Sequence, residues 1–177
     1  ERDMSGAKPM NRLLEGDVGS GKTAVAASAL VLTAANGHQG VVMAPTEVLA
    51  RQHFVLLSEM LMPLGINVAL LVGGMDPERR GEVVSGIRDG RIDIVVGTHA
   101  IIQQDVEFRS LGLAVVDEQH KFGVEQRAIL KGKGTGSAPH ALLMTATPIP
   151  RTLALTVYGD LDISIIRELP KGRKPIV

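Results

Sequence analysis

The feature of this sequence that most restricts its possible folds is a glycine-rich segment placed between a strand and a helix. Residues 16–23 read Gly-Asp-Val-Gly-Ser-Gly-Lys-Thr and fit the pattern GxxxxGK[ST] at every fixed position. An apolar run at 11–15 precedes the segment, and an amphipathic stretch at 22–36 follows it. In this context backbone N–H groups and the helix N-terminus can face a phosphate. The alternative, a glycine-rich turn without a ligand, does not account for the flanking strand and helix.

Short apolar runs alternate with amphipathic stretches along the whole chain. The apolar runs lie at 11–15, 40–44, 67–72, 92–96, 113–116, 141–144 and 163–166. The expected helices lie at 22–36, 47–64, 77–89, 124–130 and 151–157. Several runs are apolar on both faces, as in strands buried between two layers of helices. We therefore predict an α/β fold with a mostly parallel sheet of about seven strands and helices on both faces.

Composition narrows the class of protein. The chain has 177 residues, enough for one folded domain, and 45% of them are hydrophobic while 21% are charged. The net charge is zero, so any contact with nucleic acid must be local. Few aromatic residues argue against a base-stacking surface, and the lack of cysteine excludes disulfides. With no signal peptide and no apolar run of about 20 residues, we expect a cytoplasmic protein.

Several junctions carry residues that end or begin helices. Asn36 and Gly37 form a C-terminal stop, whereas Asp76 and Pro77 place a capping residue before a proline in the first turn. The Gly- and Ser-rich residues 131–139 predict a surface loop.

Two carboxylates follow the apolar run at 113–116. Asp117 and Glu118 stand at its carboxyl end, where open α/β sheets bind ligands. An isolated pair of this kind is more often a helix cap or part of a solvated loop, but here it follows a phosphate loop. We expect Asp117 to hold Mg²⁺ through water and Glu118 to orient or deprotonate the attacking water. Lys22 would neutralise the outer phosphates, and the Thr23 hydroxyl would bind the metal.

These interpretations predict a site for ATP and Mg²⁺. The expected catalytic residues are Lys22, Asp117 and Glu118, and the expected metal ligands are Thr23 and Asp117. The expected nucleotide-binding residues are Gly16, Asp17, Val18, Gly19, Ser20, Gly21, Lys22, Thr23 and His120.

The sequence Asp-Glu-Gln-His at 117–120 resembles the D-E-x-H box of the superfamily-two helicases. Segments that resemble further motifs of this family follow in the expected order, at 44–50 with Gln52, at 97–100 and at 145–148. The closer likeness is to the RecG family of bacterial branch-migration helicases, through residues 10–19, 117–127, 145–154 and 158–162. Glu15 and Lys121 stand where Gln and Arg are expected. The transcription-repair coupling factors share parts of this pattern and are the alternative, but residues 160–162 and 169–175 fit RecG better.

The resemblance implies roles for residues outside the phosphate loop. Contacts to a DNA backbone are expected from Thr46, Arg51, Thr98 and His99. Coupling between the nucleotide and DNA is expected from Gln119, His120, Thr145 and Thr147. A plain solvated helix face remains the alternative for Arg51, and a strand end for the two threonines. No role is assigned to His38 or His53.

The resemblance also implies a larger protein. Residues 1–170 would be the first RecA-like motor domain, with a P-loop NTPase fold, and 171–177 would begin a linker to a second RecA-like domain. That domain would supply an arginine to the transition state, so we expect very slow ATP hydrolysis by this chain alone. Branched or duplex DNA and a wedge domain of the same protein are the other expected partners. A P-loop switch or kinase would leave the segments after residue 44 unexplained, and a purely structural module would not need Lys22, Thr23, Asp117 and Glu118.

Overall fold

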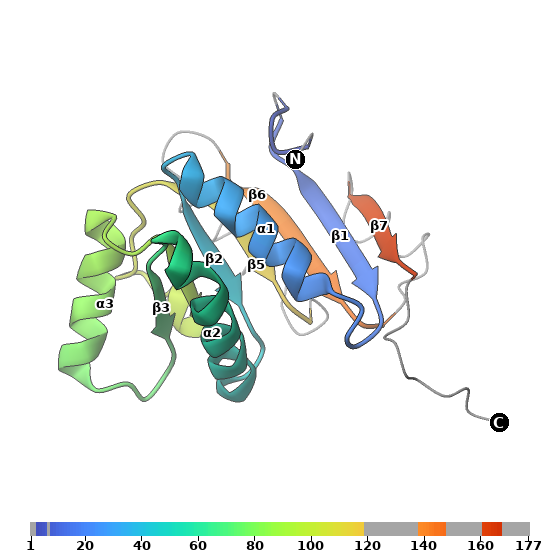
Figure 1. Cartoon of the computed structure of the whole chain (residues 1–177). Coiled ribbons are helices and arrows are strands. Elements are labelled where there is room, and N and C mark those ends of the chain that lie inside the picture. The colour runs from blue at the N-terminus through green and yellow to red at the C-terminus, as the bar shows by residue number, and fades with distance from the viewer. Residues whose placement is uncertain (1–2, 7, 119–137, 148–160, 168–177) are drawn as a thin grey trace.

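The computed structural model describes residues 3–6, 8–118, 138–147 and 161–167. Within these ranges a seven-stranded sheet has the order β3-β4-β2-β5-β6-β1-β7, and every pair of neighbouring strands is parallel (Figure 1). The strands are β1 (Asn11–Gly16), β2 (Gln39–Met43), β3 (Val68–Leu71), β4 (Ile94–Gly97), β5 (Leu111–Val116), β6 (His140–Thr145) and β7 (Asp162–Ile166). All seven predicted strands are confirmed.

Three α-helices connect the strands in the first part of the chain. They are α1 (Lys22–Ala35), α2 (Glu47–Leu61) and α3 (Pro77–Asp89). The expected helix at 47–64 is wrong in its last turn, since residues Met62–Leu64 form a 3₁₀ helix, η1. Pro63 explains the difference, because proline has no N–H and its ring would clash with the carbonyl one α-turn earlier. A second 3₁₀ helix, η2 (His99–Ile102), was not predicted. The helices expected at 124–130 and 151–157 lie outside the described residues.

The ends of the helices follow the local sequence. The Asp76 side chain accepts hydrogen bonds from the backbone N–H groups of Glu78 and Arg79, which confirms it as the cap of α3. Helix α1 ends at Asn36, and Gly37 follows with φ 76°, which confirms the predicted stop.

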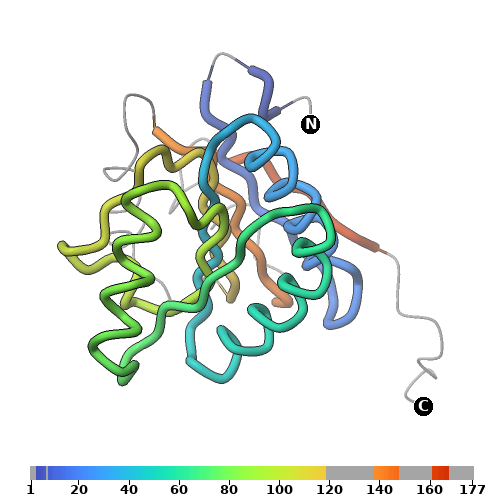
Figure 2. The backbone as a smooth tube through the Cα atoms, turned by 60° about the vertical axis from the view of Figure 1, so that its left-hand side comes forward, coloured from blue at the N-terminus to red at the C-terminus, as the bar shows by residue number. Residues whose placement is uncertain are grey.

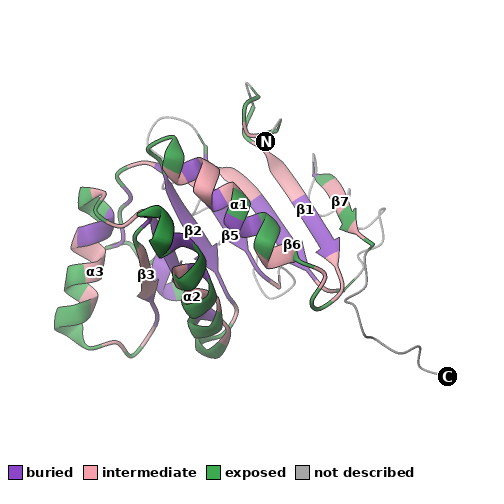
Figure 3. Ribbon diagram, viewed as in Figure 1, coloured by how far each residue is buried: buried purple, intermediate pink, exposed green. Residues whose placement is uncertain are grey.

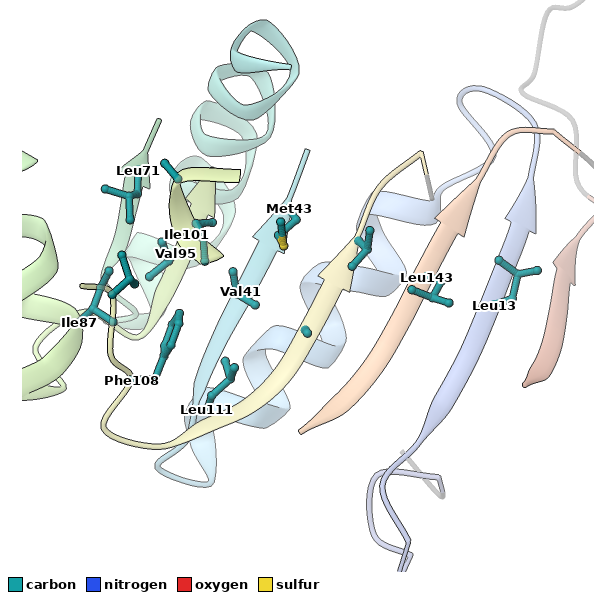
Figure 4. Packing of buried hydrophobic residues seen from close by; sticks show 14 of the residues in the cluster. Leu13, Val41, Met43, Leu71, Ile87, Val95, Ile101, Phe108, Leu111 and Leu143 are labelled. Carbon is teal, nitrogen blue, oxygen red and sulfur yellow. The ribbon is translucent and has the colours of Figure 1, made fainter. Parts of the chain in front are cut away.

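Both faces of the sheet are covered, so successive residues of a strand enter different cores. Val41 and Met43 of β2 belong to one core with Ile87 of α3, whereas Val42 belongs to the other with Leu30 of α1. Figures 2 and 4 show the arrangement: α1 and α2 lie on one side of the strands, and Ile87 packs beside Val95 and Phe108 on the other. Figure 3 shows the buried strands between them. The predicted parallel sheet with helices on both faces is confirmed.

Candidate nucleotide-binding site

The carboxyl ends of all the strands meet at one edge of the sheet, because neighbouring strands are parallel. The segments that leave this edge carry nearly all of the predicted site residues within the described ranges. Across the sheet from β4 to β1, the residues that follow or end the strands are Thr98, Thr46, Asp117, Thr145 and Gly16. The candidates for DNA contact therefore lie toward one end of the edge, the phosphate loop lies toward the other, and Asp117 and Thr145 lie between them.

The phosphate loop begins where β1 ends and closes on itself. A Cβ atom on Gly16 would lie 2.5 Å from the Ser20 hydroxyl and 3.2 Å from Cβ of Ile166, so the loop leaves no room for a side chain there. Gly21 has φ 96°, a backbone conformation that suits glycine, and α1 starts at the next residue. The shape of the loop therefore requires glycine at these two positions, which are the two fixed glycines of the sequence pattern.

The Lys22 ammonium group lies inside the turn of the loop. Its Nζ atom donates to the backbone carbonyl of Gly16 at 2.6 Å and to that of Asp17 at 3.0 Å. The Asp17 carboxylate in turn accepts from the backbone N–H of Val18 at 2.8 Å. The charge of Lys22 is thus held at the mouth of the loop by neutral acceptors, which anionic phosphate oxygens can replace as stronger partners.

The Asp117 carboxylate lies at the end of β5 and is held by hydrogen bonds to both of its oxygens. Oδ1 accepts from the backbone N–H of Glu118 at 3.0 Å, and Oδ2 lies 2.7 Å from Nε2 of His53. The backbone N–H of Asp117 donates to the carbonyl of Met43 in β2. Since each carboxylate oxygen has two lone-pair directions, both can still bind a metal or its water.

Glu118 has a left-handed backbone conformation, with φ 50°. No other non-glycine residue in the described ranges has a positive φ. For an L-residue this conformation costs roughly 1–2 kcal/mol, so the surrounding structure must maintain it. The strained turn comes directly after Asp117 and lets the Glu118 N–H reach back to the Asp117 carboxylate.

His53 was assigned no role from the sequence, yet it contacts a predicted catalytic residue. It lies three residues after Ala50 and four residues before Leu57, about one helical turn from each, and so shares the buried face of α2. The sequence signal that could have marked His53 is its position as a polar side chain on an apolar helix face. The sequence could not identify its partner, because Asp117 belongs to a distant strand.

The donor groups at this edge fit Mg²⁺. Thr23 offers a hydroxyl and Asp117 a carboxylate, which are the hard oxygen ligands that this ion prefers. The described residues contain no group of three or more His, Cys, Asp or Glu side chains able to hold a metal. Mg²⁺ is usually bound in proteins by one or two carboxylates together with substrate phosphates and water.

The four candidates for DNA contact differ in exposure. Thr46 is exposed at the start of α2, where its hydroxyl accepts from the N–H of Leu49, and the side chain of Arg51 is 60% exposed. His99 is also exposed. Thr98 is only 3% exposed, and its hydroxyl has no hydrogen-bond partner among the described residues. The structure therefore presents Thr46, Arg51 and His99 to solvent and buries Thr98.

Thr145 and Thr147 form a small hydrogen-bonded unit after β6. Their hydroxyl groups lie 3.0 Å apart, and the N–H of Thr147 donates to Oγ1 of Thr145 at 3.1 Å. Thr145 is buried and pairs with Glu15 of β1, directly before the phosphate loop, whereas Thr147 is exposed. Gln119 and His120, the other two residues expected to couple the sites, lie outside the described residues.

The opposite edge of the sheet, where the strands begin, carries a cavity of about 410 Å³. Its lining includes His38, Ser110 and His140, and it touches neither the phosphate loop nor Asp117. Burial lowers the pKa of His140 below its ordinary value, and the charge of His38 lowers this pKa further. The chemistry of the phosphate loop and the carboxylates, rather than cavity size, therefore identifies the candidate site.

Comparison with known proteins places this arrangement among the helicases. The sequence profile of the DEAD/DEAH box helicases matches residues 4–156. Proteins named ATP-dependent DNA helicase RecG are similar to the chain: that of Aquifex aeolicus is 56% identical over 99% of the chain, and that of Bacillus subtilis 55% identical over 98%. The structure of RecG bound to a three-way DNA junction is also similar, with 47% identity, a TM-score of 0.84 and coverage of 99% of the chain.

The similarity concerns only a part of these larger proteins. The chain spans 22% of the length of the Aquifex aeolicus protein, 25% of the Bacillus subtilis protein and 23% of the junction-bound RecG chain. The helicase MrfA bound to DNA, 20% identical with a TM-score of 0.68, shares the fold. In the part of the chain that the structure describes, no helix is both long and apolar enough to cross a membrane.

Proposed function

The chain belongs to the DEAD/DEAH box helicase family, and we propose that it is the ATP-binding motor domain of a DNA helicase or translocase of the RecG type. In this proposal the whole protein hydrolyses ATP to remodel branched DNA, such as stalled forks and Holliday junctions, in recombination and repair. The RecG relatives confirm the resemblance that the motifs predicted. They do not favour the alternative, a transcription-repair coupling factor.

The observation that carries the proposal is the common edge of the sheet. The phosphate loop of 16–23, the carboxylates of Asp117 and Glu118, and the solvent-facing start of α2 all follow strands at this edge, and the end of β6 lies between the loop and Asp117. A nucleotide switch or kinase would need the first two features only. A motor also needs a nucleic-acid surface beside the nucleotide, and the solvent-facing Thr46 and Arg51 support the proposal that this edge provides it.

The proposed roles follow from the chemistry of each group. The loop N–H groups and Lys22 bind the phosphates, while Thr23 and Asp117 hold Mg²⁺. Glu118 orients the attacking water and accepts its proton. When bound, Mg²⁺ neutralises charge that develops on the phosphate oxygens.

Domain organisation is part of the same proposal. Residues 1–170 form one ATP-binding domain, and residues 171–177 start the connection to a second RecA-like domain. That second domain supplies an arginine, which in related phosphoryl-transfer enzymes contributes about 10³ to 10⁵ in rate. The chain by itself should bind nucleotide and hydrolyse it very slowly.

A titration with a fluorescent ATP analogue tests the proposal, in the presence and in the absence of Mg²⁺. We expect Mg²⁺-dependent binding by the wild-type chain and its loss in Lys22→Ala, because the substitution removes the ammonium group from the loop. Lys8→Ala is the matched control, since Lys8 is an exposed lysine outside the loop. It should bind the analogue like the wild type.

The same titration can overturn the proposal. Folded wild-type chain that does not bind the analogue at millimolar concentration would contradict it, provided that the whole protein also fails to bind. Equal binding by Lys22→Ala and the wild type would show that the loop is not the phosphate site. For the motor function, branched DNA should increase the rate of ATP hydrolysis by the whole protein.

A further inference from the structure

His53 and Asp117 join two parts of the candidate site that the sequence separates by a long stretch of chain. Nε2 of His53 lies 2.7 Å from Oδ2 of Asp117, and the two side chains are 13% and 12% exposed. An ionised carboxylate can only accept hydrogen bonds, so the ring nitrogen is the donor. A short hydrogen bond to a charged acceptor in such a sheltered place is among the stronger ones in proteins.

The histidine is mounted on a helix that is fixed on one face and exposed on the other. Ala50 and Leu57, on either side of His53, are buried against the sheet. Thr46 and Arg51 of the same segment face solvent, and Arg51 pairs only loosely with Glu47 at 4.0 Å. Helix α2 and its cap thus carry two of the proposed nucleic-acid contacts and the partner of the proposed metal ligand within about two turns.

We propose that His53 is a positioning residue, which holds the Asp117 carboxylate in place for Mg²⁺ and ties it to helix α2. The inference rests on the proposed function. The other carboxylate oxygen is fixed by the N–H of Glu118, so His53 removes the remaining freedom of rotation about the side chain. Any shift of α2 when Thr46 and Arg51 engage a DNA backbone is carried to the carboxylate through this hydrogen bond.

Hydrogen bonds to a metal-binding carboxylate have measurable consequences. Loss of such an outer partner typically costs 10- to 100-fold in metal affinity or activity. His53→Ala should therefore raise the Mg²⁺ concentration needed for half-maximal binding of an ATP analogue by about 10- to 100-fold. Nucleotide binding without Mg²⁺ should not change, because Asp117 acts through the metal.

The test uses the whole protein with three variants. His53→Ala removes the donor, His53→Gln returns an amide N–H near the position of Nε2, and His38→Ala is the control, since His38 pairs with Ser110 at the opposite edge. The measurements are Mg²⁺ titrations of analogue binding, analogue binding without Mg²⁺, and the ratio of ATP hydrolysis rates with and without branched DNA. Thermal unfolding shows which variants are folded at the assay temperature.

We expect His53→Ala to weaken Mg²⁺ binding and to lower the stimulation by DNA, and His53→Gln to recover most of both. His38→Ala should match the wild type. Folded His53→Ala with an unchanged Mg²⁺ requirement and unchanged stimulation would overturn the inference, as would equal losses in His53→Ala and His53→Gln. If binding responds to Lys22→Ala but not to His53→Ala, the proposed function stands and only the role of His53 fails.

Discussion

Substitution of Gly97 by alanine tests the packing that positions the proposed DNA-facing segment. Gly97 ends β4 and pairs with Leu71 of the edge strand β3. A Cβ atom on Gly97 would overlap the Leu71 carbonyl oxygen and would lie 2.8 Å from its carbon and 3.0 Å from Cδ1 of Ile101. Ordinary contacts between heavy atoms lie at about 3.5–4.0 Å, and relief of the overlap with the carbonyl oxygen requires β3 to move away by about 1.5 Å or more.

The cost of this movement can be estimated from its parts. Overpacking a well-packed site costs about 1–3 kcal/mol. The shift also breaks the hydrogen bond from the N–H of Thr98 to the Leu71 carbonyl, now 3.3 Å long, which costs about 1 kcal/mol. Alanine gives the unfolded chain less conformational entropy than glycine does, which offsets about 0.4–1 kcal/mol of this loss. We expect Gly97→Ala to lower the free energy of unfolding by about 2–3 kcal/mol.

Gly81→Ala is the matched control, because Gly81 lies inside helix α3 and no atom other than those of its chain neighbours and the nearby backbone of the helix lies within 4 Å of its added Cβ. This substitution should stabilise the chain by about 0.5–1 kcal/mol, since alanine favours helix interiors over glycine. Urea unfolding of both variants measures the difference, with the slope of free energy against denaturant checked for constancy. Unfolding free energies within about 1 kcal/mol of each other would refute the proposed clash at Gly97.

Three further substitutions test other interactions. The hydrogen bond from Arg91 holds the pKa of Asp89 below its ordinary value of 3.8. This pair therefore stabilises the fold above pH 3.8, and the stabilisation is lost as the pH falls through the lowered pKa. Asp89→Asn should lower stability at pH 7, and unfolding curves should converge with the wild type in strong acid. Burial lowers the pKa of His140 below 6.5, so acidification below 6.5 favours the unfolded chain; His140→Gln should lose less stability than the wild type between pH 7 and 5. Thr46→Ala should cost about 1 kcal/mol in thermal or urea unfolding by removing the cap of α2, and Thr46→Ser should restore it.

The sequence predicted the elements of this fold better than their arrangement. Each apolar run, such as the one at 113–116, became a strand because a parallel sheet buried on both faces requires apolar side chains throughout. The order of the strands across the sheet is set by packing between distant segments, which no local pattern reveals. The end of α2 at Leu61 could have been predicted from Pro63.

The features of the candidate site also differ in whether the sequence alone could reveal them. The phosphate loop and Asp117 were identified from the sequence because their spacing to a strand or helix is a local property. The hydrogen bond between His53 and Asp117 and the left-handed backbone of Glu118 were not, since one depends on a tertiary contact and the other on backbone angles. The roles of the site residues remain predictions that the variants above can test.

The position of β1 in the sheet has a consequence for how the protein folds during synthesis. This strand is synthesised before the other six described strands, yet it pairs with β6 and β7, and Met10 and His140 are already 130 residues apart. At about 5–20 residues per second, β1 must wait roughly 7–26 s for its first neighbour. Contacts of such long range also slow folding. The phosphate loop attached to β1 should therefore become competent only after β6 has been synthesised, and nascent chains that end before residue 140 should not bind nucleotide.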